Sequence, residues 1–362
     1  MAGGAGERFW PLSRKNRPKQ LLNLTDPSKS LLEESVGRIA ALIPPEQVFV
    51  ATGRHLQAPI RAADLPIPDE NVIAEPCKRN TAGCLVYAAA VALARFDSSA
   101  SDLTMAVVTA DHQIGEVEKF LHTVEVALAA AETEQALVTI GIKPTRAATG
   151  YGYIEIPEGA VTCAGSSREF PVYKVASFHE KPDLYTANQY LESGRFLWNS
   201  GMFFWTVSAF LSELDQTAPQ YAETCRQMQT AIANGDEQTV EEVFAALPGE
   251  SIDYVLMEHA RNVLVTPGTF PWDDVGSWDA LERTFPHDGN GNVTVGDPVL
   301  VESSNCIVYN EPGADQTAVA IVGCEDLVVV TTKDGMLVVP KERVQGVRAA
   351  VKALKERNAS QL

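Results

Sequence analysis

A glycine-rich segment with an adjoining arginine lies at the start of the chain. Gly3, Gly4 and Gly6 precede Arg8. Backbone N–H groups of such a turn can approach a phosphate closely, and a neighbouring arginine can neutralise its charge. Phe9 stands where the dinucleotide-binding fingerprint needs its third glycine, and the Gly-Lys-Ser/Thr of a Walker A loop does not follow. The segment indicates a phosphate site of another kind, with a plain tight turn as the alternative.

Two aspartates far apart in the sequence could hold a divalent cation. Asp111 follows an apolar run that ends at Ala110, and open α/β sheets bind ligands at the carboxyl ends of their strands. Asp274 lies in a turn rich in glycine and tryptophan. Mg²⁺ prefers one or two carboxylates together with phosphate oxygens. A helix cap is the alternative for each aspartate, and Asp273 competes with Asp274 for the metal role.

Glu180-Lys181-Pro182 ends a predicted strand, because a proline blocks its continuation into the sheet. Lysine is a compact charge that suits a phosphate, and glutamate can accept hydrogen bonds from hydroxyl groups. A surface salt bridge beside a turn is the alternative interpretation.

Four polar side chains precede an alanine-rich helix: Glu75, Arg79, Asn80 and Thr81. We expect Asn80 or Thr81 to cap that helix. Capping explains one of the four side chains, so the segment is also a candidate for ligand binding.

Apolar runs that alternate with helices make up the first part of the chain. Ser30 and Glu33 form a predicted capping box. Helices are predicted over 31–42, 80–95 and 116–132, and strands over 47–52, 104–109 and 136–142. Because these strands are apolar throughout, we expect a sheet covered on both faces. The prediction is an α/β, Rossmann-like domain with a mixed, mostly parallel central sheet.

The composition changes twice further along. Residues 151–205 are rich in predicted strands, with a helix at 183–193, and helices dominate 207–259. A break rich in Gly, Asn and Asp at 286–292 precedes short strands and a final helix at 343–357. We predict two domains, 1–286 and 287–362, the second built of stacked strands.

The 362 residues include 29 Lys and Arg against 47 Asp and Glu, a formal net charge of −18. Such a surface repels nucleic acid and anionic membranes, so we expect neither as a partner. Residues 1–20 reverse this balance with five basic side chains, among them Lys19, against one acid. The six cysteines are widely spaced, and neither a membrane-spanning run nor a signal peptide is evident. These features predict reduced thiols and a cytoplasmic location.

A series of motifs runs through nearly the whole chain. They are GGAGERFWPLSR at 3–14, PKQ at 18–20, EPCKRNTA at 75–82, ADHQI at 110–114, GIKPT at 141–145, TGYGYI at 149–154, FHEKP at 178–182, WNSGMF at 198–203, SIDY at 251–254 and WDDVGSW at 272–278. Together they resemble the sugar-nucleotide pyrophosphorylases, nucleotidyltransferases that join a nucleoside triphosphate to a sugar 1-phosphate. The resemblance narrows to the mannose-1-phosphate guanylyltransferases at residues 75–82 and beyond.

The resemblance implies that GTP and α-D-mannose 1-phosphate give GDP-mannose and pyrophosphate by in-line attack on the α-phosphorus, with Mg²⁺ or another divalent cation bound by Asp111 and Asp274. It implies that Arg8, Lys19 and Lys181 are the catalytic cations. The implied nucleotide-binding residues are Gly3, Gly4, Gly6, Glu75, Arg79, Asn80 and Thr81, and the implied sugar-binding residues are Gly152, Glu180 and Asn199. It also implies a nucleotidyltransferase domain over 1–286 and a left-handed β-helix-like domain over 287–362. A homodimer is a further expectation.

Two other functions stay open at this point. One is a pyrophosphorylase for another pair of nucleoside triphosphate and sugar 1-phosphate, and the other is a catalytically silent regulatory homologue. In the family an apolar strand precedes the glycine segment, whereas Met1 and Ala2 stand there in this sequence. We therefore expect the native chain to begin upstream of Met1. Because the sequence ends at Leu362, without the isomerase domain of bifunctional relatives, we expect guanylyltransferase activity alone.

Overall fold

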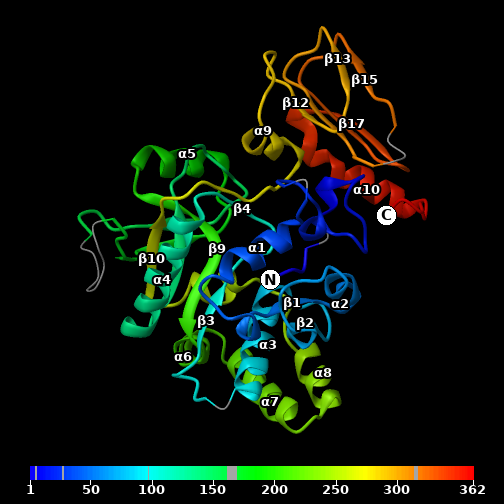
Figure 1. Cartoon of the computed structure of the whole chain (residues 1–362). Coiled ribbons are helices and arrows are strands. Elements are labelled where there is room, and N and C mark those ends of the chain that lie inside the picture. The colour runs from blue at the N-terminus through cyan, green and yellow to red at the C-terminus, as the bar shows by residue number, and fades with distance from the viewer. Residues whose placement is uncertain (5, 27, 97, 161–168, 314–316) are drawn as a thin grey trace.

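A computed structural model describes residues 1–362 except 5, 27, 97, 161–168 and 314–316, so Ala5 and Cys163 lie outside the described residues (Figure 1). Its centre is a seven-stranded sheet in the order β7-β10-β5-β9-β6-β8, with β3 also paired to β9. The strands are β3 Thr104–Val107, β5 Leu137–Ile142, β6 Tyr153–Glu155, β7 Tyr173–Lys174, β8 Ser177–His179, β9 Phe196–Thr206 and β10 Val263–Gly268. A parallel pair, β1 Val50–Gly53 and β2 Val72–Glu75, lies beside it.

The prediction of a mixed sheet is confirmed, but the prediction that it is mostly parallel is wrong. In the seven-stranded sheet β10 pairs parallel with β5, and all the other pairs are antiparallel. The reason is β9, which pairs with β5 along one edge and with β3 and β6 along the other. The predicted strands β3 and β5 do run in the same direction, but β9 lies between them in the opposite direction.

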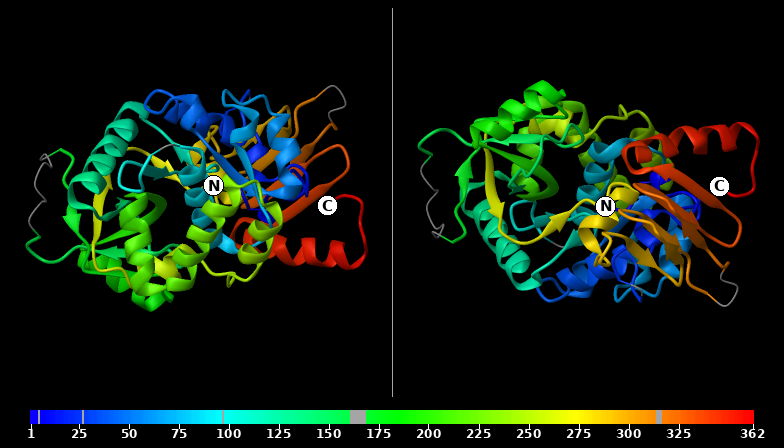
Figure 2. Two further views of the ribbon diagram at one scale, coloured as in Figure 1. Left: turned by 90° about the horizontal axis from the view of Figure 1, so that it is seen from below. Right: turned by 90° about the horizontal axis from the view of Figure 1, so that it is seen from above.

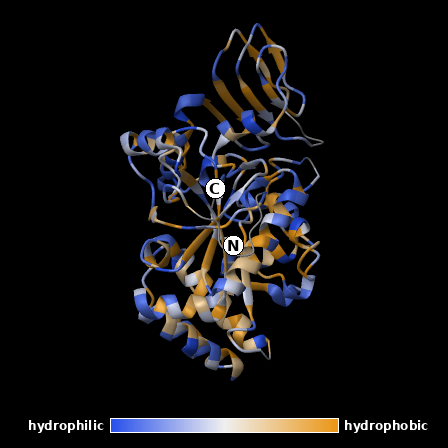
Figure 3. Ribbon diagram, turned by 90° about the vertical axis from the view of Figure 1, so that its left-hand side faces the viewer, coloured by the Kyte–Doolittle hydropathy of each residue, from blue (hydrophilic) through white to orange (hydrophobic). Residues whose placement is uncertain are grey.

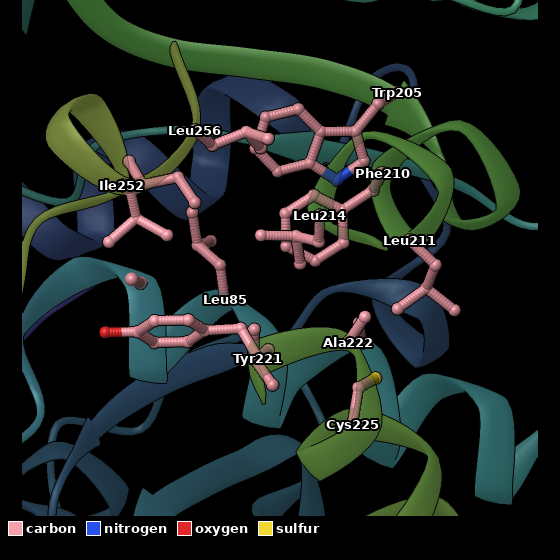
Figure 4. Packing of buried hydrophobic residues seen from close by; sticks show 14 of the residues in the cluster. Leu85, Trp205, Phe210, Leu211, Leu214, Tyr221, Ala222, Cys225, Ile252 and Leu256 are labelled. Carbon is pink, nitrogen blue, oxygen red and sulfur yellow. The ribbon is translucent and has the colours of Figure 1, made fainter. Parts of the chain in front are cut away.

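Apolar side chains on both faces of the sheet explain the continuous apolar runs. Leu137 and Phe203 pack into one cluster with the helical layer, whereas their neighbours Val138 and Phe204 pack into a second cluster under α4. Figure 3 shows apolar colouring along the central strands, and also on the strands of the C-terminal part. Figure 4 shows the first cluster, in which Trp205 and Phe210 stack with ring centroids 4.7 Å apart.

The helices are α1 Leu31–Ile39, α2 Arg54–Arg61, α3 Asn80–Arg95, α4 Val117–Glu134, α5 Leu184–Ser193, α6 Val207–Thr217, α7 Pro219–Ala233, α8 Glu237–Ala245, α9 Leu281–Thr284 and α10 Val347–Glu356. The predicted capping box of Ser30 and Glu33 is present at α1. The predicted cap of α3 is wrong, because neither Asn80 nor Thr81 provides a side-chain cap. The Thr81 hydroxyl instead accepts a hydrogen bond from the Ile252 N–H at 2.8 Å, which ties α3 to the distant 251–254 segment. In the described part of the chain, no helix has the length and apolar character needed to cross a bilayer.

The first two residues lie between the two sheets. The Met1 amine donates a hydrogen bond to the Val108 carbonyl at 3.0 Å, and the Ala2 N–H donates to the Ala51 carbonyl at 2.8 Å. An apolar groove of about 530 Å³ continues from Met1 between the β1 and β3 segments, with side chains of α1 and α3 in its walls. The expectation that the native chain begins upstream of Met1 stays a prediction.

The C-terminal residues form two small stacked sheets and a helix. One sheet has the order β12-β14-β16-β17 and the other pairs β13 with β15. The strands are β12 Val293–Val295, β13 Val299–Val301, β14 Ile307–Asn310, β15 Ala320–Val322, β16 Leu327–Thr331 and β17 Met336–Pro340. All these pairs are parallel except β16–β17, as expected for stacked strands. The handedness of the stack and the domain boundary stay predictions.

This C-terminal part packs against the beginning of the chain. Phe9 and Leu12 share a buried cluster with Trp278, Ile307 and Val347. Both views in Figure 2 place the orange and red C-terminal elements beside the blue N-terminal segment. The glycine-rich segment is therefore positioned by residues from both ends of the chain.

Candidate active site

Lys19 joins the two aspartates that sequence analysis selected. Its Nζ donates to Asp111 Oδ2 at 2.8 Å and to the Asp274 carbonyl oxygen at 2.6 Å. The short pair β4 Gln113–Ile114 and β11 Trp272–Asp273 is antiparallel, and it brings the turn after β11 to the residues before β4. A lysine 92 positions before Asp111 is thus held at the junction of two segments that are distant in sequence.

The environment of this junction keeps Asp111 ionised. Burial opposes ionisation, but the charge and hydrogen bond of Lys19, with the charge of His112 when that ring is protonated, outweigh it and hold the pKa of Asp111 below its ordinary value. Burial also lowers the pKa of His112, so its imidazole is neutral at pH 7. The Trp272 indole N–H donates to His112 Nδ1 at 3.2 Å and fixes the ring.

Asp273 and Asp274 have different partners, which separates the two candidates. Asp273 pairs with Arg283 and accepts the Val275 N–H at 2.8 Å. Asp274 Oδ1 accepts a hydrogen bond from the Tyr151 hydroxyl at 2.7 Å. Asp274 contacts Lys19 through its backbone carbonyl, and its carboxylate bonds Tyr151, whereas the carboxylate of Asp273 is taken up by Arg283.

The glycine segment has one glycine that its own fold requires and two that it does not. Gly6 has φ +61°, and a Cβ there would lie 2.6 Å from Lys19 Cβ and 2.8 Å from the Lys19 backbone nitrogen. A Cβ at Gly3 or Gly4 would meet nothing within 4 Å. Internal packing therefore explains why residue 6 is a glycine. The exposed Gly3 and Gly4 instead leave open space beside the backbone. Arg8 is half-buried next to them.

The predicted sugar-binding residues lie together. A Cβ at Gly152 would lie 2.6 Å from Glu180 Oε2 and 3.3 Å from Asn199 Cβ. The Glu180 carboxylate pairs with Lys181 Nζ. Burial opposes the charge of Lys181, but the hydrogen bond and charge of Glu180 raise the pKa of this lysine above its ordinary value. The Asn199 backbone N–H donates to the Gly152 carbonyl at 2.8 Å.

Asp253, which had no role among the residues predicted from the sequence, fixes Asn199. The Asn199 Nδ2 group donates to Asp253 Oδ1 at 3.0 Å, and Asn199 Oδ1 accepts the Gly201 N–H at 3.1 Å. One N–H of the amide is left for a ligand. Burial, with the nearby charge of Glu180, raises the pKa of Asp253 to about 6. The SIDY motif at 251–254 was the signal in the sequence.

Tyr151 lies between the predicted sugar-binding residues (Gly152, Glu180 and Asn199), which we call the sugar end, and the aspartates. It had no role among the residues predicted from the sequence. Its hydroxyl bonds Asp274, and its carbonyl accepts the Lys181 N–H at 3.3 Å. Burial, followed by the charge of Asp274, raises the pKa of Tyr151, so the hydroxyl remains protonated. Tyr151 therefore contacts Asp274 through its side chain and residue 181 through its backbone.

The structure shows what holds residues 75–81 in place but does not test their predicted binding of the nucleotide. Burial raises the pKa of Glu75 to about 7, opposed by a hydrogen bond with Cys84. The Arg79 guanidinium donates to the Ala245 carbonyl at the end of α8, and Asn80 Oδ1 accepts the Thr81 N–H at 2.9 Å. These contacts hold the segment in place, and its role in nucleotide binding stays a prediction.

The two aspartates fit a site for Mg²⁺. Within the described ranges, groups of three or more His, Cys, Asp or Glu side chains able to hold a metal are not found. Asp111 Oδ1 and Asp274 Oδ2 have no hydrogen-bond partner among the described residues, while the other oxygen of each carboxylate is bonded to Lys19 or Tyr151. Two carboxylates with one available oxygen each suit a small hard cation that completes its shell with phosphate oxygens and water.

Comparison with known proteins gives the family. A nucleotidyl transferase model matches residues 1–291, and a model of the MannoseP isomerase/GMP-like β-helix domain matches residues 296–354. A mannose-1-phosphate guanylyltransferase of Escherichia coli is 38% identical over 98% of this chain and 73% of its own length. The chain belongs to the mannose-1-phosphate guanylyltransferase family.

Other members of the family agree with this assignment. The guanylyltransferase of Klebsiella pneumoniae is 38% identical over 100% of this chain and 74% of its own length. A crystal structure from Thermus thermophilus, described as a mannose-1-phosphate geranyltransferase, has a TM-score of 0.84 and 37% identity and covers 98% of both chains. The expected resemblance to the family and the expected nucleotidyltransferase fold are therefore confirmed.

Proposed function

We propose that this chain is a mannose-1-phosphate guanylyltransferase that converts GTP and α-D-mannose 1-phosphate into GDP-mannose and pyrophosphate. Two findings support the proposal: identity over almost the whole chain to guanylyltransferases, and the contacts of Lys19 with Asp111 and Asp274. The observation that carries it is the junction of Lys19 with Asp111 and the Asp274 turn, linked through Tyr151 to Glu180 and Lys181. In this scheme cations act at both ends of the bound substrates, and the two aspartates act between them.

The reaction is an in-line displacement at the α-phosphorus of GTP. A phosphate oxygen of mannose 1-phosphate forms the new P–O bond, the bond from the α-phosphorus to the oxygen bridging the β-phosphorus breaks, and pyrophosphate leaves with that oxygen and its electron pair. The acceptor phosphate is largely dianionic near neutral pH, so a general base is not needed. The obstacle is repulsion between two anions, which positioning and charge neutralisation overcome.

Each charged side chain has a part in this scheme. Arg8 and Lys19 stabilise negative charge on the triphosphate, and Lys181 holds the phosphate of the nucleophile. Lys19 also keeps Asp111 ionised and in place. Glu180 and the fixed amide of Asn199 bind sugar hydroxyls, with the Gly152 backbone beside the ring. Asp111 and Asp274 would hold Mg²⁺, which when bound neutralises phosphate charge.

Recognition of guanine is assigned to residues 75–81. This assignment comes from the family resemblance, supported by the position of Thr81, which is bonded to Ile252 beside Asp253. The segment is thereby linked to the sugar end of the cleft. A cytoplasmic location belongs to the proposal and is supported by the free thiols of the five described cysteines. A homodimer stays a prediction.

The deciding experiment measures pyrophosphate release by the full chain with Mg²⁺, mannose 1-phosphate and one of four nucleotides: GTP, ATP, UTP or dTTP. Glucose 1-phosphate replaces mannose 1-phosphate in a parallel series. The proposal predicts the highest kcat/KM for GTP with mannose 1-phosphate. Preference for another pair would establish a different pyrophosphorylase, and binding of GTP without turnover of any pair would establish a silent homologue.

A further inference from the structure

The C-terminal helix lies directly against the glycine-rich segment. α10 packs on the short helical turn Glu7–Phe9, and Val347 and Val351 are buried in the same cluster as Phe9. Lys355 of α10 forms an ion pair with Glu7. Figure 1 shows α10 in red beside the dark blue start of the chain. Residues of the C-terminal domain are therefore within reach of a ligand bound at this segment.

Gln345, just before α10, joins Arg8 to the turn that carries Asp274. Arg8 Nη1 donates to Gln345 Oε1 at 3.5 Å, and Gln345 Nε2 donates to Ser277 Oγ at 3.0 Å. The amide thus uses its acceptor on the arginine and one donor on the serine. Gln345 thus lies between Arg8 and Ser277.

Arg348 lies on the same side of this helix. It precedes Lys355 by about two turns of α10, and Lys355 pairs with Glu7, so the two side chains lie on the same face of the helix. Arg348 is exposed, and it has no hydrogen bond or ion pair with any residue that the structure describes. An unpartnered arginine therefore faces the region of Arg8.

The electrostatics of Arg8 agree with this placement. Burial lowers the pKa of Arg8, and the positive charge of Arg348 lowers it further. Asp274, Asp279 and Tyr151 act in the opposite direction. Two arginines held near each other repel, and a polyanion between them removes the repulsion.

We propose that Arg348 is a further binding residue for the terminal phosphates of the nucleotide and for the pyrophosphate that leaves. This inference rests on the proposed function. The α-phosphorus must lie near the Asp111–Asp274 pair and the nucleophile held by Lys181. The β- and γ-phosphates then extend away from Lys181, toward Arg8 and Arg348. The C-terminal domain completes the pyrophosphate end of the cleft.

The test compares two arginine substitutions in the full chain. Arg348→Ala removes the proposed contact, and Arg343→Ala is the matched control, since Arg343 is also exposed but lies before α10, in the 3-10 turn Lys341–Gly346. We expect Arg348→Ala to raise the KM for GTP, and the KM for pyrophosphate in the reverse reaction, about tenfold. The KM for mannose 1-phosphate should stay within twofold of wild type. Arg343→Ala should match wild type in all three, and Arg348→Lys should recover part of the loss.

Direct binding separates this inference from the proposed function. Calorimetric titration with inorganic pyrophosphate and Mg²⁺ should show weaker binding by Arg348→Ala than by Arg343→Ala, with equal melting temperatures for the two variants. Equal KM and equal pyrophosphate affinity in the two variants would overturn the inference, even if wild type makes GDP-mannose. If wild type makes no GDP-mannose, the proposed function fails, and the titration alone then decides whether Arg348 binds the anion.

Discussion

Gly152→Ala adds one methyl group at the sugar end of the cleft. The new Cβ would lie 2.6 Å from Glu180 Oε2 and 3.3 Å from both Asn199 Cβ and Phe178 Cε1. The backbone cannot easily withdraw, because the Gly152 carbonyl accepts the Asn199 N–H at 2.8 Å. The Glu180 carboxylate, only 6% exposed and paired with Lys181, must therefore move.

The expected loss of affinity for mannose 1-phosphate follows from the hydrogen bond between the Glu180 carboxylate and a sugar hydroxyl, which the displaced carboxylate can no longer form. A hydrogen bond to a charged group contributes about 1.5–3 kcal/mol, which corresponds to roughly a 10- to 150-fold change in binding. We expect the KM for mannose 1-phosphate to rise within that range, while the KM for GTP changes less than threefold. Steady-state assays of pyrophosphate release, with each substrate varied in turn, measure both constants.

Gly150→Ala is the matched control, because a Cβ at that position meets nothing within 4 Å. It should behave like wild type. If Gly152→Ala and Gly150→Ala have the same KM for mannose 1-phosphate, and both remain folded, the placement of the sugar beside Glu180 is wrong.

Three further outcomes are expected. Gly6→Ala should lower the free energy of unfolding by at least about 1–2 kcal/mol, because φ is +61° and the new Cβ meets Lys19. Gly4→Ala should leave the urea midpoint unchanged and raise the KM for GTP. Equal urea midpoints for the two variants would contradict this contrast. Asp274→Ala should reduce Mg²⁺-dependent turnover by about 10²-fold or more without unfolding the chain, and wild-type turnover in this variant would remove Asp274 from the metal site. Asp273→Asn should retain turnover but lower the melting temperature, because the ion pair with Arg283 is lost. The folded-state pKa of Glu75 is raised to about 7 from 4.5, so its ionisation destabilises the folded state as pH rises through that window. The free energy of unfolding of Glu75→Gln should therefore exceed that of wild type by on the order of 2 kcal/mol at pH 8 and by little at pH 4.5. A difference in urea unfolding that does not depend on pH would refute the raised pKa.

Local signals in the sequence predicted the helices well. The predicted capping box at Ser30 is present, and the helix predicted at 183–193 is found as α5; the structure adds that the Asp183 side chain accepts the Thr186 N–H, and both caps depend on residues within three positions of each other. The direction of β9 depends instead on pairing with β3, β5 and β6, which lie far from it in the sequence. Apolar runs show that strands are buried but do not show which strands are neighbours.

In the candidate site, too, local residue patterns were predictable from the sequence, whereas contacts between distant segments were not. Residue types and motifs predicted Asp111, Asp274, Glu180 and Lys181; in the structure Lys19 contacts Asp111 and the Asp274 backbone, and Glu180 pairs with Lys181, while their roles stay predictions. The sequence could not show that Lys19 bridges the two aspartate segments, because that contact depends on the β4–β11 pair. Nor could it show that the C-terminal helix lies on the glycine-rich segment, since that contact is formed by residues more than 300 positions apart.

A crystal structure with GDP-mannose and Mg²⁺ bound tests the central claim most directly. We predict the mannose beside Glu180 and Asn199, the diphosphate and metal at Asp111 and Asp274, and the guanine near residues 75–81. GDP-mannose bound with its diphosphate away from both aspartates would contradict the account.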